Sequence, residues 1–323
     1  MEEIIKSVDI TETTNSTAEA VSEVLALDPG VQNLLIVVLA FIMLSVSLSL
    51  KSADFDFIKK HPTSILIGSI AQLLGLPLLT LLLIFIIVPS PGAALGMIVI
   101  ACCPGGNVSN LLTRISNSDA AYSVALTSVS SVFAAIMLPF AILFWTGLYG
   151  PTADLLQEIN IDRADFIIKT GITLAIPVAT GLLAAYRWPT IASKLAKILV
   201  PISIFLIVTV IALGVKANLG VLLGSGAILL PIVIIHNVTA FGLGYITGYF
   251  GLRDKRKARA LTFEVGIQNA GLGLLIVLSQ LGGVGDAALI VALWSLWHLI
   301  AGLLLVGIFR LGDKWRESPN AAA

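Results

Sequence analysis

Long apolar runs alternate with short polar segments along most of the chain. A helix needs roughly 20 mostly apolar residues to cross the hydrocarbon core of a bilayer. Runs of this kind lie near residues 31–50, 63–88, 92–115, 119–147, 165–187, 194–215, 220–250, 258–281 and 286–310. This pattern predicts an all-α integral membrane protein with nine transmembrane helices, whose two termini lie on opposite sides.

The composition agrees with a membrane protein. The 323 residues are 57% hydrophobic and 12% charged, whereas soluble domains carry about 25% charged residues. The formal net charge is zero, so no nucleic-acid partner is expected. Cys102 and Cys103 are adjacent, which is unfavourable for a structural disulfide. No basic start precedes a short apolar core, so no cleavable signal peptide is expected.

Basic residues are unevenly distributed over the polar segments. They follow the first, third, fifth, seventh and ninth predicted spans, most densely in RDKRKAR at Arg253–Arg259, whereas the alternate segments are richer in acidic residues. Lys and Arg are enriched in cytoplasmic loops. The pattern therefore predicts a multi-pass protein of the cell membrane, with residues 1–30 as an extracytoplasmic polar tail and residues 312–323 as a cytoplasmic tail. We interpret RDKRKAR as a topology anchor in preference to a lipid head-group site.

Glu264 is the only acidic residue placed deep within a predicted span. A carboxylate at that depth costs several kcal/mol unless it is paired or bound to a cation. No Lys or Arg lies in the central part of a predicted span to pair with it. Three interpretations stay open: a protonated side chain bonded to a neighbouring helix, a proton relay, and a bound metal cation.

The residues around Glu264 favour the cation. Three glycines follow it within the same span: Gly266, Gly271 and Gly273. Because each lowers helix propensity by about 1 kcal/mol relative to Ala, the helix is expected to unwind and to free the carbonyls of Val265 and Ile267. With the Gln268 amide, these groups form the oxygen-rich set that a hard cation prefers. A single carboxylate suits Na⁺ better than Ca²⁺.

A second interruption is predicted in ACCPGGNVSNLLTRIS, residues 101–116. Pro104 and the two glycines after it break the helix at mid-span, and a new half-helix is expected to start near Asn107. Its free N–H groups and positive dipole end would point into the membrane. Broken helices at corresponding places in the two halves of a chain are typical of the binding sites of secondary transporters.

Other polar residues lie within the predicted spans. Ser123 and Thr127 are four residues apart and share a helix face, although small hydroxyl residues in membrane helices more often serve packing. Gln72 is an isolated mid-span amide and a better ligand candidate. His236 and His298 are candidate proton carriers, but a His hydrogen-bonded between helices is the commoner case.

In its motifs, the chain resembles the bile acid:sodium symporters over residues 35–305. The stretches that carry the resemblance are IMLSVSLSLKSADF, IAQLLGLP, CCPGGNVSN, SVALTSVSS, LTFEVGIQNAG and WSLWH. The resemblance implies two inverted repeats, a core domain with two crossing broken helices and a panel domain that contains spans one, five and six. The chain is similar to the nine-span form, with residues 31–150 as the first repeat and residues 151–311 as the second.

The resemblance also implies two sodium sites and a substrate site. One sodium site would use Ser109, Asn110, Ser123, Thr127 and Glu264. The other would use Gln72, Glu264, Gln268 and the carbonyls of Val265 and Ile267. Substrate would bind near the crossing, at Asn107, Asn269 and His298. The chain departs from the common bacterial pattern at Asn107, Ala270 and Leu299, which leaves the identity of the substrate open.

Together these observations predict a secondary active transporter that imports an organic anion with Na⁺ by alternating access. The anion would be a bile acid or a small carboxylate such as pantoate. The alternative is a cation/proton exchanger that uses Glu264 as its shared site. The sequence places no nucleophile beside a base, so no enzymatic activity is expected. The expected partners are the organic anion and membrane lipid, and the oligomeric state is left open.

Overall fold

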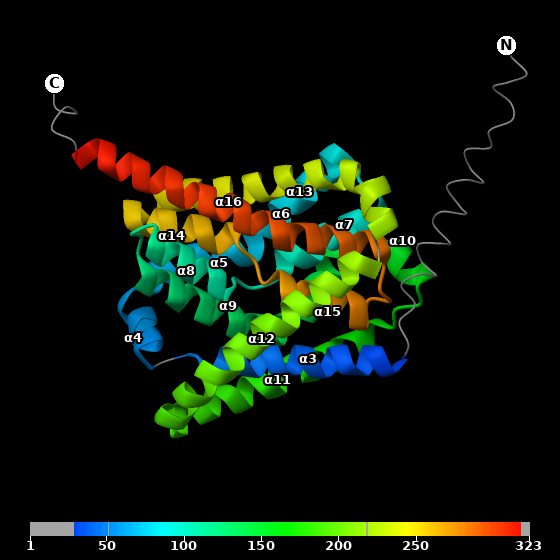
Figure 1. Ribbon diagram of the computed structural model, residues 1–323, viewed down its shortest axis with the longest axis horizontal. Helices are drawn as coiled ribbons and strands as arrows, with labels where there is room; N and C mark the ends of the chain where they lie inside the picture. Colours follow the sequence, from blue (N-terminus) through cyan, green and yellow to red (C-terminus); the bar gives the residue numbers. More distant parts are fainter. Residues whose placement is uncertain (1–28, 51, 218, 318–323) are drawn as a thin grey trace, which may run out of the picture.

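The computed structural model describes residues 29–50, 52–217 and 219–317, and every regular element in these ranges is a helix (Figure 1). The predicted tail at residues 1–30 lies almost wholly outside the described residues, as does the last part of the predicted 312–323 tail. The elements are α3 (Pro29–Leu48), α4 (Ser52–Lys60), α5 (Pro62–Ile70), the π-helical η1 (Ala71–Gly75), α6 (Leu76–Ile87), α7 (Pro91–Cys102), α8 (Asn107–Ile115), α9 (Ala120–Gly147), α10 (Gly150–Glu158), α11 (Arg163–Arg187), α12 (Pro189–Ala217), α13 (Leu219–Thr247), the π-helical η2 (Gly248–Leu252), α14 (Lys255–Gly266), α15 (Ala270–Gln280) and α16 (Gly285–Glu317).

Seven helical stretches among the described residues are long and apolar enough to cross a membrane. They are 30–48, 62–87, 120–147, 163–187, 189–209, 228–252 and 285–315. The other two predicted spans are each divided into two shorter helices, α7 with α8 and α14 with α15. Both divisions fall in the segments where the sequence predicts a broken helix.

Polar caps outside the apolar runs determine where several helices begin. The Asp119 side chain accepts a hydrogen bond from the Tyr122 amide at 3.0 Å and caps α9. Asp162 caps α11 in the same way, and Asp254 caps α14 through the amides of its first turn. An aspartate at this position satisfies amide groups that have no partner within the helix.

The helices form two groups. α3, α11 and α12 pack on one another along one side of the molecule, and the remaining long helices form the larger group (Figure 1). The larger group encloses fully buried side chains such as Tyr122, Phe263 and Trp294. The smaller group consists of the three spans that the sequence analysis assigned to the panel.

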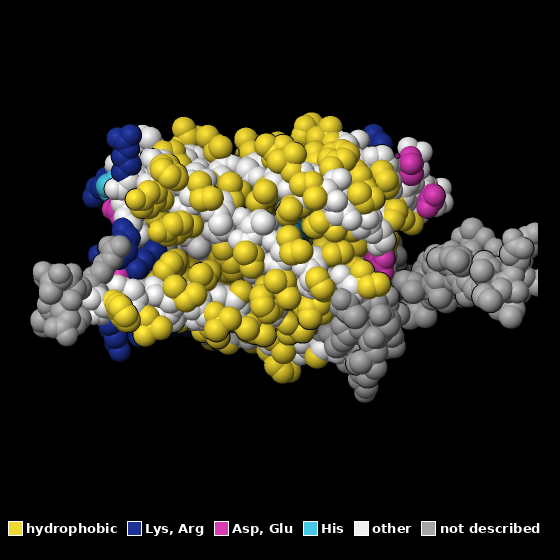
Figure 2. Space-filling model, turned by 90° about the horizontal axis from the view of Figure 1, so that it is seen from above, with side chains coloured by type: hydrophobic (Ala, Val, Ile, Leu, Met, Phe, Trp, Pro, Cys, Tyr) yellow, Lys and Arg dark blue, Asp and Glu magenta, His cyan; other side chains and the backbone are white. Residues whose placement is uncertain are grey.

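The surface is divided into an apolar middle and two charged ends. Figure 2 shows hydrophobic side chains over most of the visible face, with most of the visible Lys and Arg at one end and most of the visible Asp and Glu at the other. Exposed aromatic side chains, including Tyr186, Tyr249 and Trp315, lie at the helix ends that lead into the basic segments. Tyr and Trp commonly mark the boundary between membrane and water, so the apolar middle is consistent with a lipid-facing band.

Glycines bring α14 into backbone contact with the helix before it. A Cβ atom on Gly244 would lie 2.6 Å from the Leu261 carbonyl oxygen, and one on Gly248 would lie 2.5 Å from the Ala258 Cα. Two small residues four positions apart allow membrane helices to approach this closely. The contact fixes the position of α14, the half-helix that carries Glu264.

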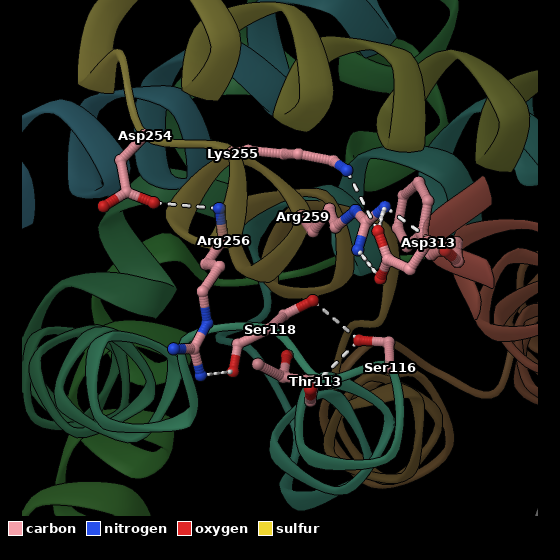
Figure 3. Close-up of polar contacts among 9 residues, drawn as sticks. Thr113, Ser116, Ser118, Asp254, Lys255, Arg256, Arg259 and Asp313 are labelled. Carbon is pink, nitrogen blue, oxygen red and sulfur yellow. Dashed lines mark hydrogen bonds and ion pairs between the residues drawn. The ribbon is translucent and has the colours of Figure 1, made fainter. Parts of the chain in front are cut away.

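An ion-pair cluster fastens the other flank of α14 to α16 (Figure 3). The buried Arg259 guanidinium donates two hydrogen bonds to the Asp313 carboxylate, at 2.6 and 2.8 Å. Its charge also lies over the Phe309 ring, 4.7 Å from the centroid. Lys255 contacts the same carboxylate from the more exposed side, at 3.0 Å.

We expect Asp313→Asn to destabilise the protein by about 2 kcal/mol, because it removes the charged acceptor of the buried Arg259 guanidinium. Lys255→Gln should change stability by less than about 0.5 kcal/mol, because its partner contact is largely solvated. Thermal unfolding of the detergent-purified variants measures both. Equal losses of stability in the two variants would contradict the assignment of Arg259 as the buried anchor.

Candidate functional site

The two broken segments cross and hydrogen-bond to each other. Gly105 and Gln268 form an isolated antiparallel β-bridge, and the backbone N–H of Asn269 donates to the Pro104 carbonyl oxygen at 2.9 Å. Pro104 has no N–H, and Cys103 before it is extended with ψ of 150°, so α7 ends there. The chain resumes as α8 at Asn107. The break predicted at Pro104 is confirmed.

Glu264 lies at this crossing, fully buried in the last turns of α14. Hydroxyl groups from α8 and α9 surround its carboxylate. Ser109 and Ser123 each donate to Oε1 at 2.5 Å, and Thr127 donates to Oε2 at 2.8 Å. The Asn110 side-chain oxygen contacts the Ser123 and Thr127 hydroxyls at 2.8 and 3.3 Å. All five residues of the first predicted sodium site therefore lie together.

This cluster contains more oxygen acceptors than protons. Each hydroxyl carries one proton, yet each faces at least two acceptor oxygens. Ser109 faces the Gly106 carbonyl as well as Glu264, and Ser123 faces both Asn110 and Glu264. Thr127 faces Asn110, Glu264 and the Ser123 carbonyl. A positive charge among these oxygens would satisfy the lone pairs that the hydroxyl protons cannot.

Side-chain amides cover the C-terminal carbonyls of α14. Gln72 donates to the Glu264 carbonyl at 3.2 Å, Gln268 donates to the Val265 carbonyl at 2.7 Å, and Asn237 donates to the Gly266 carbonyl at 2.7 Å. The side-chain oxygens of all three amides are buried and have no hydrogen-bond partner among the described residues. They are available to a cation beside the last turn of α14.

Gln72 reaches this position through a local irregularity. It lies in η1, a π-helical turn between α5 and α6. Such turns are frequent at functional sites. Gln72 and Gln268 both donate to the Glu264 carbonyl oxygen, at 3.2 and 3.3 Å, and Gln268 also donates to the Val265 carbonyl. Ile267 follows at the break with extended backbone. Hydrogen bonds thus link Gln72, Gln268, Glu264 and Val265 of the second predicted sodium set.

The glycines after Glu264 have a different role from the predicted one. Only residues 267–269 are unwound, and Gly271 and Gly273 lie inside α15. A Cβ atom on Gly266 would lie 2.1 Å from the Phe241 ring, and one on Gly271 would lie 2.8 Å from Ile207. These glycines permit close packing around the break, and the expectation that they unwind the helix is wrong for Gly271 and Gly273.

A cavity of about 200 Å³ lies beside the crossing, between α3, α12 and α16. The three predicted substrate residues, Asn107, Asn269 and His298, all line it. His298 Nδ1 lies 2.5 Å from the Trp294 carbonyl oxygen. Since a carbonyl only accepts, Nδ1 carries the proton, and Nε2 of the neutral ring is an acceptor. His236 is elsewhere, bonded to Thr80 at 2.7 Å between α13 and α6.

Two features of the site were missed from the sequence. Asn237 lies on α13 and belongs to no motif that was singled out, yet its amide holds the Gly266 carbonyl. Ser45 and Ser203 line the cavity from α3 and α12, joined by a 2.8 Å hydrogen bond. These residues could be recognised as polar side chains within predicted spans. They are far in sequence from the two breaks, so the sequence gave no indication that they contact the site.

Broken helices that cross at a buried carboxylate are typical of secondary membrane transporters. The sequence comparison supports the same class and also identifies a family within it. The model of the sodium bile acid symporter family matches residues 36–225, and the chain belongs to that family.

Several characterised or named relatives share this sequence pattern. An uncharacterised sodium-dependent transporter of Bacillus subtilis, YocS, is 28% identical over 285 residues, which cover 88% of this chain and 85% of the relative. The human ileal sodium/bile acid cotransporter is 28% identical over 279 residues, 85% of this chain and 77% of the relative. A probable chloroplastic sodium/metabolite cotransporter of rice is 30% identical over 239 residues, 74% of this chain and 55% of the relative. The family and these relatives are sodium-dependent transporters and not enzymes.

Proposed function

We propose that this protein is a Na⁺-coupled symporter that imports a small organic anion. The observation that supports this most strongly is the Glu264 carboxylate, held at the helix crossing by hydroxyls from two other helices. It is a buried negative charge surrounded by oxygens. No Lys or Arg among the described residues forms an ion pair with it. Sodium accepts oxygen ligands of these types.

In this proposal two Na⁺ ions share Glu264. The first is held by the carboxylate with Ser109, Asn110, Ser123 and Thr127. The second is held by Gln72, Gln268, Glu264 and the backbone carbonyls of Val265 and Ile267. Both ions connect α14 to elements of the first half of the chain. Binding would therefore fix the two broken segments in their crossed arrangement.

The anion would bind in the 200 Å³ cavity, close to the start of α8. No side chain caps α8, so the N–H groups and positive dipole of its first turn can interact with a carboxylate. Sites for drug-sized ligands commonly measure about 300–1,000 Å³. The smaller volume here favours a compact carboxylate such as pantoate over a bile acid.

The wider architecture completes the proposal. The chain would span the membrane nine times, with its N-terminus outside and its C-terminus in the cytoplasm, where the basic residues gather. Residues 31–150 and 151–311 would form the two inverted repeats. The core would move against the panel of α3, α11 and α12, exposing the crossing to each side of the membrane in turn.

Uptake into proteoliposomes tests the proposal. Labelled pantoate and taurocholate are offered with and without an inward Na⁺ gradient, and a pH-sensitive dye is trapped inside. We expect Na⁺-driven uptake of pantoate in excess of taurocholate. Na⁺-driven pH changes in the absence of an organic anion would instead support the cation/proton exchanger, which requires only Glu264.

Substitutions should separate the ion sites from the anion site. We expect Thr127→Ala and Gln268→Ala to weaken Na⁺ binding, measured by calorimetry without substrate, because each removes an oxygen ligand. His298→Ala should leave that affinity near normal and raise the pantoate concentration needed for half-maximal uptake. Coupling between the ligands, typically 1–3 kcal/mol, is absent from a measurement with Na⁺ alone. Unchanged Na⁺ affinity in both ion-site variants would contradict the assigned sites.

A further inference from the structure

A second cavity lies next to the substrate pocket, toward the basic end of the molecule. It measures about 480 Å³ and lies among the ends of α3, α11 and α12. We refer to it as the basic-end cavity, lined among others by Leu48, Ser49, Ser193, Lys197 and Val200. Val200 also lines the substrate pocket. The two cavities therefore lie on either side of this side chain.

The same helix faces line both cavities. On α12, the lining residues recur every three or four positions: Pro189, Ser193, Lys197, Val200, Ile204 and Ile207. On α3, Ile42 and Val46 line the substrate pocket, and Ser49 continues the spacing into the basic-end cavity. Residues at this spacing lie on one side of a helix. The two cavities therefore follow one another along the same faces of α3 and α12, and we refer to the pair as the groove.

Among the described residues that line these two cavities, Lys197 is the only Lys, Arg, Asp or Glu. Its side chain is exposed, and the ion pairs between described residues do not include it. It lies about 9 Å along the helix axis from Ser203 in the substrate pocket, at 1.5 Å per residue. Lys194 lies one turn away on the same helix but lines neither cavity.

We propose that this groove is the route by which the transported anion reaches the cytoplasm, and that Lys197 forms a transient subsite for its carboxylate. The inference rests on the proposed function, since it takes the anion from the pocket at the crossing. Between the two sites the walls are mostly aliphatic, with the Ser49 and Ser193 hydroxyls near Lys197. An exposed ammonium attracts a carboxylate weakly, which allows binding and release in quick succession.

Membrane vesicles of opposite orientation test the subsite. Na⁺-driven uptake of labelled pantoate into inside-out vesicles reports binding from the cytoplasmic face. We expect Lys197→Gln to raise the half-saturating pantoate concentration there by about two- to fivefold. The value in right-side-out vesicles should not change. Lys194→Gln should change neither, and the difference between the variants should vanish near 1 M salt, where charges are screened within about 3 Å.

Cysteine labelling tests which ligand occupies the groove. Ser193→Cys should react with a membrane-impermeant maleimide, and pantoate with Na⁺ should slow the reaction. Lys194→Cys should react without protection, and the native Cys102 and Cys103 are buried. Protection of Ser193→Cys by anionic lipid in place of pantoate would identify a lipid site and overturn the proposal.

The outcomes distinguish failure of the proposed function from failure of the Lys197 subsite alone. If wild-type protein takes up neither pantoate nor taurocholate with Na⁺, the proposed function fails and the groove assignment with it. If the wild type transports one of them but Lys197→Gln matches Lys194→Gln in inside-out vesicles, only the subsite is overturned.

Discussion

Glu264→Gln should abolish Na⁺-dependent uptake and weaken Na⁺ binding by more than about 100-fold, or ~2.7 kcal/mol. Both proposed ion sites use this carboxylate, and glutamine keeps its size while removing its charge. The substituted amide also brings two protons into a cluster that has too few. The folded protein should therefore be at least as resistant to heat as the wild type, although it no longer binds Na⁺.

Calorimetry for Na⁺ and thermal unfolding in detergent measure the two effects separately. Glu158→Gln is the matched control, because Glu158 is an exposed carboxylate at the end of α10. It should behave like the wild type in both experiments. Full Na⁺-stimulated transport by Glu264→Gln would exclude Glu264 as the coupling residue.

Two adjacent glycines at the first break should respond very differently to alanine. A Cβ atom on Gly105 would lie 2.6 Å from Glu264 Oε2 and 3.0 Å from Gln72 Nε2. The carboxylate and the amide belong to the proposed ion sites and must shift to admit it. We expect Gly105→Ala to reduce Na⁺-driven uptake at least tenfold, about 1.4 kcal/mol in Na⁺ affinity.

Gly106→Ala is the internal control for this experiment. Its added Cβ would meet nothing closer than 3.7 Å, which is ordinary van der Waals contact. Uptake should stay within about twofold of the wild type, a difference below ~0.5 kcal/mol. Equal losses in both variants would mean that the break is sensitive to any side chain and that the contact with Glu264 is unimportant.

The sequence predicted the interrupted segments because their chemistry is local. Pro104 lacks an amide proton, which disfavours a continuous helix at that position. A carboxylate at membrane depth needs polar or charged partners. Both features can therefore be recognised without knowledge of the fold. The ends of the spans were also close, since apolar length is set by the membrane. The largest difference is at the predicted last span, 286–310, because α16 continues to Glu317, where Asp313 pairs with Arg259.

What the sequence could not supply is pairing between distant positions. Asn237 and Gly266 are 29 residues apart, and Arg259 and Asp313 are 54 apart. A single sequence contains nothing that links such positions. The short helices α4 and α10 were missed because they lie in polar segments, where apolar periodicity gives no signal. The role of Gly271 was misjudged because a glycine that permits close packing has the same helix propensity as one that permits unwinding.

The glycine contact between α13 and α14 has a mechanical consequence. At Gly244 and Gly248 the backbones of the two segments are in direct contact, and no flexible side chain lies between them. Sliding or rotating one helix against the other would drive carbonyl groups into Cα atoms, so the pair resists shear. In the proposed alternating-access cycle, a displacement of Glu264 would therefore carry α13 along with α14 as one rigid unit. The movement in that proposal would take place at the boundary between the larger helix group and the helices α3 and α12.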